Sequence, residues 1–365
     1  MTGPRLVHLT TTAMSLDWLL RPQLEAFVDA GFDVVAMSAP GPHVEAIEGS
    51  GIRHVAIPSL TRSMRPARDV RALGELVTAF RRLRPAIVHT HNPKPGLLGR
   101  VAARAARVPV VLNTVHGLYA LPGDRLPKRA VVYGLERLAS TCSDAELLQN
   151  PEDLPVLRRL GVPHDKLTVL GNGVDLRRFD PARVSGSARR RLRAELGIAE
   201  TTTVVGVVGR LVWEKGYATI FAGTAAMAAA GTTAVSWSAP RSPEKPGAVP
   251  SSARAAAEAH GVRFLKRGRH EVDLYAKSST RTRSRPTGRV RSAMEAAAMG
   301  LLVVATDIRG AGRWSRRERP VSCSRSTTCR RSSARCAATC RIRSVVPRSG
   351  PRLARGRSPT STIVR

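Results

Sequence analysis

The sequence predicts an α/β protein of two Rossmann-like, doubly wound domains, of which the second is incomplete and is followed by a disordered tail. Three observations support this prediction. Apolar strand-like runs alternate with helical segments, a turn-rich stretch at 171–181 interrupts the alternation, and the pattern fades after about residue 236. Apolar strands that alternate with helices favour a parallel sheet covered on both faces. We therefore expect domains at 1–180 and 181–312 and a disordered tail at 313–365.

The expected strands of the first domain are short runs rich in Val, Leu and Ile. They cover residues 5–9, 32–37, 53–57, 86–90, 108–113 and, as a short extended piece, 146–149. The expected helices carry apolar residues three and four positions apart, and Gly31 and Pro151 mark two helix ends. They cover residues 16–30, 44–48, 66–83, 97–106, 128–139 and 151–160. Ligands of such folds bind beyond the carboxyl ends of the strands, here at 10–15, 89–96 and 114–117.

The second domain begins after the turn-rich stretch at 171–181, which we interpret as a linker. A helix at 188–196, a strand at 203–208 and a helix at 218–229 follow in order. Beyond residue 236 only fragments of the pattern remain. These are helices at 253–260, 272–276 and 292–299 and strands at 262–265 and 301–306.

The net charge of +32 comes from 59 basic and 27 acidic residues, and it is concentrated at the end of the chain. From residue 311 onward there are 15 arginines and one acid, Glu318. Such a tail binds nucleic acid or anionic membranes without specificity. Only 4% of residues are aromatic, so bases would find few stacking partners. We expect no specific nucleic-acid partner, although a basic nucleic-acid-binding protein stays an alternative.

The sequence shows no apolar run of 18 residues and no signal-peptide pattern. We therefore expect a cytoplasmic location. Peripheral association with the inner face of the cell membrane is compatible with it. Five cysteines stand at positions 142, 323, 329, 336 and 340, and no two of them form a Cys-x-x-Cys pair. Zinc sites use closely spaced ligands, so we expect no metal.

The strongest candidate site is Val208-Gly-Arg-Leu-Val-Trp-Glu-Lys-Gly216. A strand delivers Arg210 to the carboxyl edge of the predicted sheet, and Lys215 lies in the loop before the next helix. Two cations beside a helix N-terminus suit a diphosphate, because the arginine fork binds two oxygens and the lysine adds a point charge.

This nonapeptide resembles the donor-diphosphate motif of the retaining GT-B glycosyltransferases of family four. Further segments are similar to a bacterial branch that builds surface polysaccharides and lipid-linked glycans. They are His89-Thr-His-Asn-Pro-Lys-Pro-Gly96, Gln149-Asn-Pro-Glu-Asp-Leu154, Gly171-Asn-Gly-Val-Asp175 and Arg291-Ser-Ala-Met-Glu-Ala-Ala-Ala-Met-Gly300. The resemblance covers about residues 1–310 and implies two domains that face a cleft. It also implies a glycosyltransferase that moves sugar from a nucleotide-sugar to a glycan or lipid-linked acceptor with retention.

The resemblance implies donor-side roles for several residues. Gly209, Arg210 and Lys215 would hold the donor diphosphate, and the two cations would stabilise the leaving group as the glycosidic bond breaks. Glu295 would accept hydrogen bonds from the ribose hydroxyls. His116 matches a histidine near the donor sugar and joins the two cations as a catalytic candidate.

Other positions are expected to face the acceptor. Thr11 and Thr12 stand in the first loop, where relatives often have a glycine pair, and His91 and Lys94 would line the acceptor side. The resemblance implies that no bound metal is needed, and no cofactor is expected, because the nucleotide-sugar is a substrate. A nucleotide-sugar epimerase on the same architecture is the rival enzyme.

The pattern breaks where the family places an acid near the donor-sugar hydroxyls, because this chain has Thr287 there. The preceding run, Ser278-Ser-Thr-Arg-Thr-Arg-Ser-Arg285, cannot pack as a buried strand. Out-of-frame translation of GC-rich DNA yields mainly Arg, Ala, Ser, Pro and Gly. We therefore hypothesise that frameshifts explain 278–290 and the tail after about residue 312, and we expect impaired activity. An evolved basic tail is the alternative.

Overall fold

The computed structural model divides the chain into two compact units, Met1–Gly171 and Asn172–Arg365. The structure describes residues 3–91, 93–120, 124–195, 197–208, 211–213, 216–229, 232–238, 248–260, 262–266, 291–301, 303–307 and 321–325. The division falls earlier than the boundary expected at residue 180. The reason is that Phe179 is buried against Ala296 and Met299 of the second unit, so 172–180 packs there and is more than a linker.

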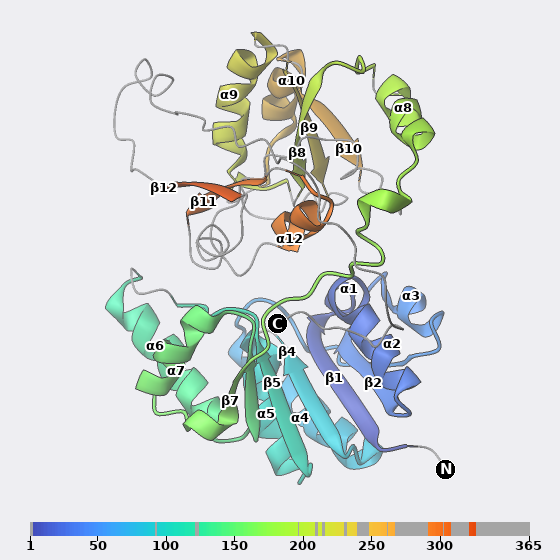
Figure 1. The fold of residues 1–365 in the computed structure, drawn as a ribbon. Helices are drawn as coiled ribbons and strands as arrows, with labels where there is room; N and C mark the ends of the chain where they lie inside the picture. The colour runs from blue at the N-terminus through green and yellow to red at the C-terminus, as the bar shows by residue number, and fades with distance from the viewer. Residues whose placement is uncertain are drawn as a thin grey trace, which may run out of the picture. The chain divides into compact units, whose positions relative to one another are not determined.

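The first unit is built on a seven-stranded sheet in which every paired strand is parallel, as Figure 1 shows. Its strand order is β3-β2-β1-β4-β5-β6-β7, and the order reverses direction between β1 and β4. This confirms the expected doubly wound α/β domain. The strands are β1 (Arg5–Thr12), β2 (Asp33–Ala39), β3 (Arg53–Ala56), β4 (Ile87–His91), β5 (Val110–Val115), β6 (Ala145–Leu148) and β7 (Leu167–Val169).

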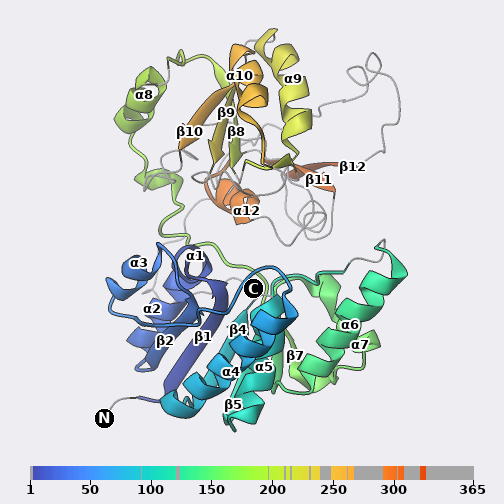
Figure 2. The ribbon, with the colours of Figure 1, turned by 180° about the vertical axis from the view of Figure 1, so that it is seen from behind.

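Helices cover both faces of this sheet (Figures 1 and 2). They are α1 (Ala13–Ser15), η1 (Leu16–Leu20), α2 (Arg21–Asp29), α3 (Val44–Glu48), α4 (Pro66–Leu83), α5 (Pro93–Ala105), α6 (Leu126–Ser140), η2 (Pro151–Asp153), α7 (Leu154–Arg159) and η3 (His164–Lys166). Successive strand residues point to opposite faces. Val35 and Met37 of β2 therefore join the core under α4 and α5, while Val34 and Ala36 join the core under η1, α2 and α3.

Helix α4 shows why the sequence signals worked in this unit. Pro66 begins the helix, where its missing N–H costs nothing, and the Asp69 side chain accepts a hydrogen bond from the Arg65 backbone N–H at 3.0 Å. Leu76, Phe80 and Leu83 recur on one buried face. The helix ends at Leu83, as predicted, and the chain turns at Arg84 with a left-handed backbone.

The described part of the second unit contains a three-stranded parallel sheet, β10-β9-β8, and a parallel pair, β11-β12. Its strands are β8 (Thr203–Val208), β9 (Thr232–Ser238), β10 (Arg263–Lys266), β11 (Val303–Asp307) and β12 (Val321–Arg325). Its helices are η4 (Pro181–Arg183), α8 (Gly186–Glu195), α9 (Tyr217–Ala229), α10 (Ser251–Ala259) and α12 (Arg291–Ala298).

Several expected elements differ from the structure. The helix expected at 16–30 contains a π-helical turn, η1, and α5 begins at Pro93 instead of residue 97. Strands β7 and β9 were not predicted. The tail expected to be disordered contains β12, whose Val-Ser-Cys-Ser-Arg sequence alternates apolar and polar residues and pairs with β11. The rest of the tail and the helix expected at 272–276 lie outside the described residues.

Candidate functional site

Four histidines meet in the carboxyl-terminal half of the first sheet, where the strand order reverses. His8 lies on β1 directly opposite His89 on the neighbouring β4, His91 is the last residue of β4, and His116 follows the end of β5. His8, His89 and His91 all point to the face covered by α2, because they alternate with Val7, Leu9 and Val88, which belong to the core under α4. The fold thus gathers residues that are far apart in the sequence.

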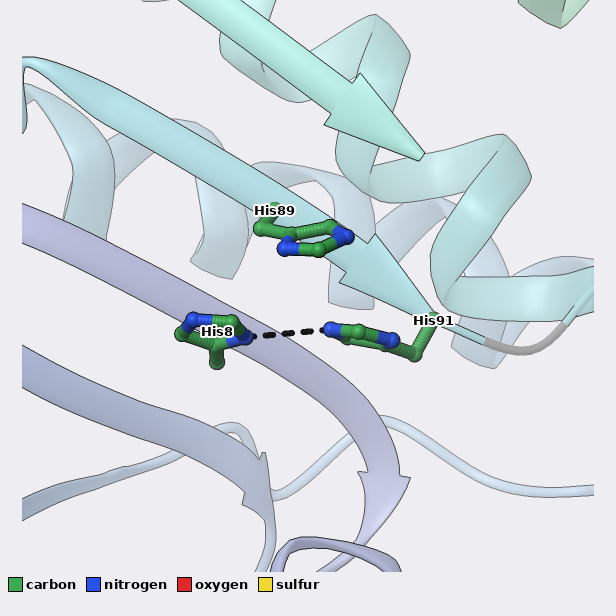
Figure 3. Close-up of side chains that lie close together, drawn as sticks. All are labelled: His8, His89 and His91. Atoms are coloured by element: carbon green, nitrogen blue, oxygen red, sulfur yellow. Dashed lines mark hydrogen bonds between the residues drawn. The ribbon is translucent and has the colours of Figure 1, made fainter. Parts of the chain in front are cut away.

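Hydrogen bonds connect three of these rings into a row, which we call the histidine chain. His8 Nδ1 lies 3.0 Å from His91 Nε2, the contact dashed in Figure 3, and His91 Nδ1 lies 3.2 Å from His116 Nε2. The fourth ring, His89, packs beside His91 with ring centroids 4.2 Å apart, and its Nε2 lies 2.7 Å from Thr114 Oγ1. Each His–His bond needs one donor and one acceptor nitrogen, so it fits neutral rings.

Burial keeps these rings neutral. Burial, with a smaller contribution from the neighbouring His116, lowers the pKa of His89 to about 3. Burial, followed by repulsion from the neighbouring histidines, also holds the pKa values of His8 and His91 well below the usual 6.5. The pKa of His116 is lowered by burial as well, although a hydrogen bond with the Gln149 side chain raises it in part. Neutral imidazoles can relay hydrogen bonds and can act as metal ligands.

Nitrogen atoms of His8, His89 and His91 all lie within 4.8 Å of one another, which makes these residues a candidate ligand set among the described residues. An all-imidazole donor set suits Zn²⁺ and other first-row transition ions better than Mg²⁺ or Ca²⁺, which prefer oxygen.

The predicted acceptor-side threonines lie at the end of β1. Thr11 is buried and Thr12 half-buried, and the pairing of β1 with β2 shifts register between Leu9 and Thr12. Thr12 Oγ1 lies 3.4 Å from both Ser15 Oγ and an Arg62 guanidinium nitrogen. These contacts place the pair at the expected edge of the sheet.

Lys94 lies at the start of α5 and is buried. Its ammonium donates hydrogen bonds to the Ser63 carbonyl and Asp69 Oδ1, both at 2.5 Å, and to Thr61 Oγ1 at 3.2 Å. Three acceptors occupy the three ammonium protons. In this structure Lys94 therefore ties the loop before α4 to α5, and it does not contact the histidine chain.

A second polar cluster lies on the opposite face of the sheet and was not predicted. The fully buried Arg100 donates hydrogen bonds to Glu146 at 2.5 Å, to Glu136 at 2.9 Å and to the Gly96 carbonyl at 2.5 Å. Burial raises the pKa of Glu146, and the Arg100 charge opposes that shift. Asn113 also donates to Glu146 at 2.7 Å. Because every member is engaged, the cluster joins α5 and α6 to the sheet.

Of the predicted donor-side residues in the second unit, only Glu295 belongs to the described part of the chain. It lies on α12 and is buried. Gly209, Arg210, Lys215 and Thr287 lie outside the described residues. The flanking elements are described: β8 ends at Val208, and α9 begins at Tyr217 directly after Gly216, whose φ is 82°. The motif therefore connects a strand to a helix, as predicted.

Sequence reasoning missed His8. A signal was present, because His8 has the same position in the expected strand 5–9 as His89 has in the expected strand 86–90. Pairing of these two strands in parallel brings the two residues together. The interpretation treated β1 as an apolar run, and only its loop residues were considered.

Comparison with known proteins shows which family the first part of the chain is similar to. Residues 23–178 match the profile of Glycosyltransferase Family 4. A UDP-Gal:alpha-D-GlcNAc-diphosphoundecaprenol alpha-1,3-galactosyltransferase of Escherichia coli is 32% identical over 195 residues, 53% of this chain and 49% of the relative. The capsular polysaccharide biosynthesis glycosyltransferase CapM of Staphylococcus aureus is 29% identical over 224 residues, 59% of this chain and 56% of the relative.

The matched regions thus span about half the length of these curated relatives. A solved structure of Anabaena HepE in complex with UDP and glucose is similar over 89% of this chain and 86% of that protein, with a TM-score of 0.66 and 17% identity. At that identity the likeness shows the fold, which is that of the GT-B glycosyltransferases. No helix in the described residues is long and apolar enough to cross a membrane.

Proposed function

We propose that this protein is a glycosyltransferase that moves a sugar from a nucleotide-sugar to a glycan or lipid-linked acceptor. The observation that carries the proposal is the combination of the family match at 23–178 with the motif 208–216 between β8 and α9. The E. coli relative is named for a UDP-galactose donor and a diphosphoundecaprenol-linked acceptor, and HepE was solved with UDP and glucose. These names favour a UDP-sugar and a lipid-linked acceptor as the first substrates to test.

In the proposed mechanism, His116 acts beside the donor sugar, and Arg210 and Lys215 are the cations. Arg210 and Lys215 bind the departing diphosphate and offset the charge that develops on it. Glu295 holds the ribose, and the acceptor attacks the donor from the side that the leaving group vacates, so that the configuration is retained. The hydrogen bond between His91 Nδ1 and His116 Nε2 helps to orient the His116 ring. Thr11, Thr12 and His91 form the acceptor side of this arrangement.

A thermal-shift panel of nucleotide-sugars tests the donor proposal. One nucleotide-sugar should raise the melting temperature of the wild-type chain and leave Arg210→Ala unchanged. Arg189→Ala, on the exposed surface of α8, is the control and should respond like the wild type. Equal responses from wild type and Arg210→Ala would contradict the assignment. Epimerised donor formed without any acceptor would support the rival epimerase.

Helix α6 supports a peripheral contact with an anionic membrane, where a lipid-linked acceptor resides. Leu126, Val131 and Leu138 on this helix are 74%, 62% and 59% exposed. Arg125 and Arg137 lie beside them. Both nearby acids are neutralised, because Asp124 pairs with Lys128 and Glu136 pairs with Arg100. Exposed apolar side chains with cations beside them fit an anionic lipid surface.

Co-sedimentation with vesicles tests this contact. The wild-type chain should bind vesicles that contain phosphatidylglycerol and should bind pure phosphatidylcholine weakly. The triple variant Leu126→Ser, Val131→Ser, Leu138→Ser should lose most of the binding. Val28→Ser, at an exposed apolar position beside the acid Asp29 on α2, is the control. Undiminished binding by the triple variant would assign the contact to another surface, such as the Arg-rich tail.

We also propose that frameshifts produced 278–290 and the tail after about residue 312. The support is compositional, because both stretches are rich in Arg and Ser and poor in apolar residues. Resequencing the locus together with peptide mass mapping of 278–365 tests the idea. An unbroken frame with matching peptides would leave an evolved basic tail as the explanation.

A further inference from the structure

The histidine chain leaves one buried nitrogen without a partner. His8 is fully buried, and its Nε2 has no hydrogen-bond partner, while its ring packs on Phe27 with centroids 5.5 Å apart. The other nitrogen of His8, Nδ1, faces the neighbouring ring, because it lies 3.0 Å from His91 Nε2. A ligand shared by these rings would therefore bind His8 Nδ1.

The rings around His8 converge as metal ligands do. Nitrogens of His8, His89 and His91 lie within 4.8 Å of one another, and the facing nitrogens of His8 and His91 are 3.0 Å apart. Figure 3 shows the His89 ring beside the gap between the other two. Zn–N bonds of about 2.0–2.1 Å place tetrahedral ligand atoms roughly 3.4 Å apart. Ring movements on the order of 1 Å would therefore complete the geometry.

We propose that His8, His89 and His91 form a binding site for one first-row transition-metal ion, with Zn²⁺ as the reference ion. The three ligands come from two adjacent strands, β1 and β4, so the backbone already holds them in register. The site lies within the first unit and needs no residue of the donor motif.

Neighbouring groups are placed to orient two of the ligands. His91 Nδ1 lies 3.2 Å from His116 Nε2, and His89 Nε2 lies 2.7 Å from Thr114 Oγ1. Metal-bound histidines usually give their other N–H to such a partner. An ion on His91 Nε2 would keep the proton on Nδ1, which donates it to His116 Nε2. The proton of the neutral His116 ring would then be on Nδ1, so the ion would set the tautomer of a residue that the proposed function uses.

Metal content tests the site directly. Untagged protein, prepared without a metal-affinity column, is dialysed against a chelator and then titrated with Co²⁺ and Zn²⁺. We expect one Co²⁺ per chain with a tetrahedral absorption spectrum, displacement by Zn²⁺ and a higher melting temperature with either ion. His8→Gln and His91→Gln should lose the spectrum. His54→Gln is the control, since His54 lies on β3 bonded to Ser38 and outside the cluster.

A ligand-exchange variant keeps the test informative if a glutamine variant fails to fold. His91→Cys should retain Co²⁺ and add a thiolate-to-cobalt charge-transfer band. The proposal is overturned if the folded wild type binds no stoichiometric ion, if His54→Gln loses binding equally, or if a folded His91→Cys chain shows no such band. None of these readouts uses a sugar substrate, so they stand or fall separately from the glycosyltransferase proposal.

Discussion

The two units differ in what they bury. The largest core cluster of the first unit combines Phe80, Leu76 and Met37 with apolar residues of four strands, and charged clusters lie beside it. The described clusters of the second unit are smaller, and one of them consists of Phe179, Ala296 and Met299. Helices α9, α10 and α12 are rich in alanine, which favours helix formation but offers little area to bury. Helix propensity and core volume are therefore separate properties.

We expect the largest loss of stability from substitution of Arg100, which forms a fully buried ion pair in the first unit. Arg100→Met leaves Glu146 buried without its cation, and breaking a buried pair costs about 3–5 kcal/mol. Urea unfolding should show this decrease in the free energy of unfolding of the first unit. Arg104→Met is the matched control, because Arg104 and its partner Asp144 are about a third or more exposed, and it should cost less than about 1 kcal/mol. Equal losses would mean that burial does not set the strength of the pair.

Two phenylalanines compare the cores directly. Phe80 and Phe179 are both almost fully buried, at 1% and 2% exposure. Phe80→Ala should cost about 3–5 kcal/mol, because the dense core around it cannot collapse into the cavity. Phe179→Ala should cost less, because its smaller cluster can relax. Urea melts of the two variants measure this difference, and a larger loss at Phe179 would break the comparison.

Acid should destabilise the first unit through its neutral histidines. With a folded-state pKa of about 3, His89 stays unprotonated while the unfolded chain takes up protons below about pH 6.5. The contribution of each such histidine to the free energy of unfolding is therefore fully present above about pH 6.5. It falls by about 1.4 kcal/mol per pH unit as the pH drops toward 3. Urea melts of metal-free protein between pH 7 and 5 should show this slope, and His89→Gln should reduce it. An unchanged slope in that variant would show that His89 does not contribute.

Glycines of two helices in the first unit should give the smallest effects. A Cβ at Gly99 of α5 would lie 2.5 Å from Leu9 Cδ2 and 2.7 Å from Thr90 Cγ2, so Gly99→Ala should cost about 1–3 kcal/mol. Gly134 on α6 has open space around it, and Gly134→Ala should stabilise the chain by up to about 1 kcal/mol. Thermal melts distinguish the two, and a stabilised Gly99→Ala would refute the close packing of α5 on the sheet.

The sequence predicted elements whose signals are local. Strand β8 and helices α3 and α4 appear at the predicted bounds, because an apolar run or a face of apolar residues with a proline start identifies them. Strand β7 has only three residues, and β9 mixes Thr, Ser and Trp, so neither produces a clear run. The start of α5 was predicted four residues too late, at residue 97, although prolines such as Pro93 and Pro95 are tolerated in the first helical turn.

The candidate site was only partly predictable for the same reason. His91 and His116 follow the ends of the strands expected at 86–90 and 108–113, where ligands bind in this fold, so the sequence indicated them. Their contact with each other, and the contribution of His8, depend on the neighbouring positions of β1, β4 and β5 in the sheet. Strand order is a long-range property, and no local pattern in the sequence encodes it. The buried partners of Lys94 come from a loop about 30 residues away and were likewise not predicted.

Transfer of labelled sugar tests the central claim most directly. The full chain, with its reading frame verified, is incubated with a panel of labelled nucleotide-sugars and a lipid-linked acceptor, and products are identified by mass. The account predicts a labelled lipid product from one donor, reduced on the order of 100-fold in Arg210→Ala. Failure to transfer any sugar, or equal transfer by Arg210→Ala, would contradict it.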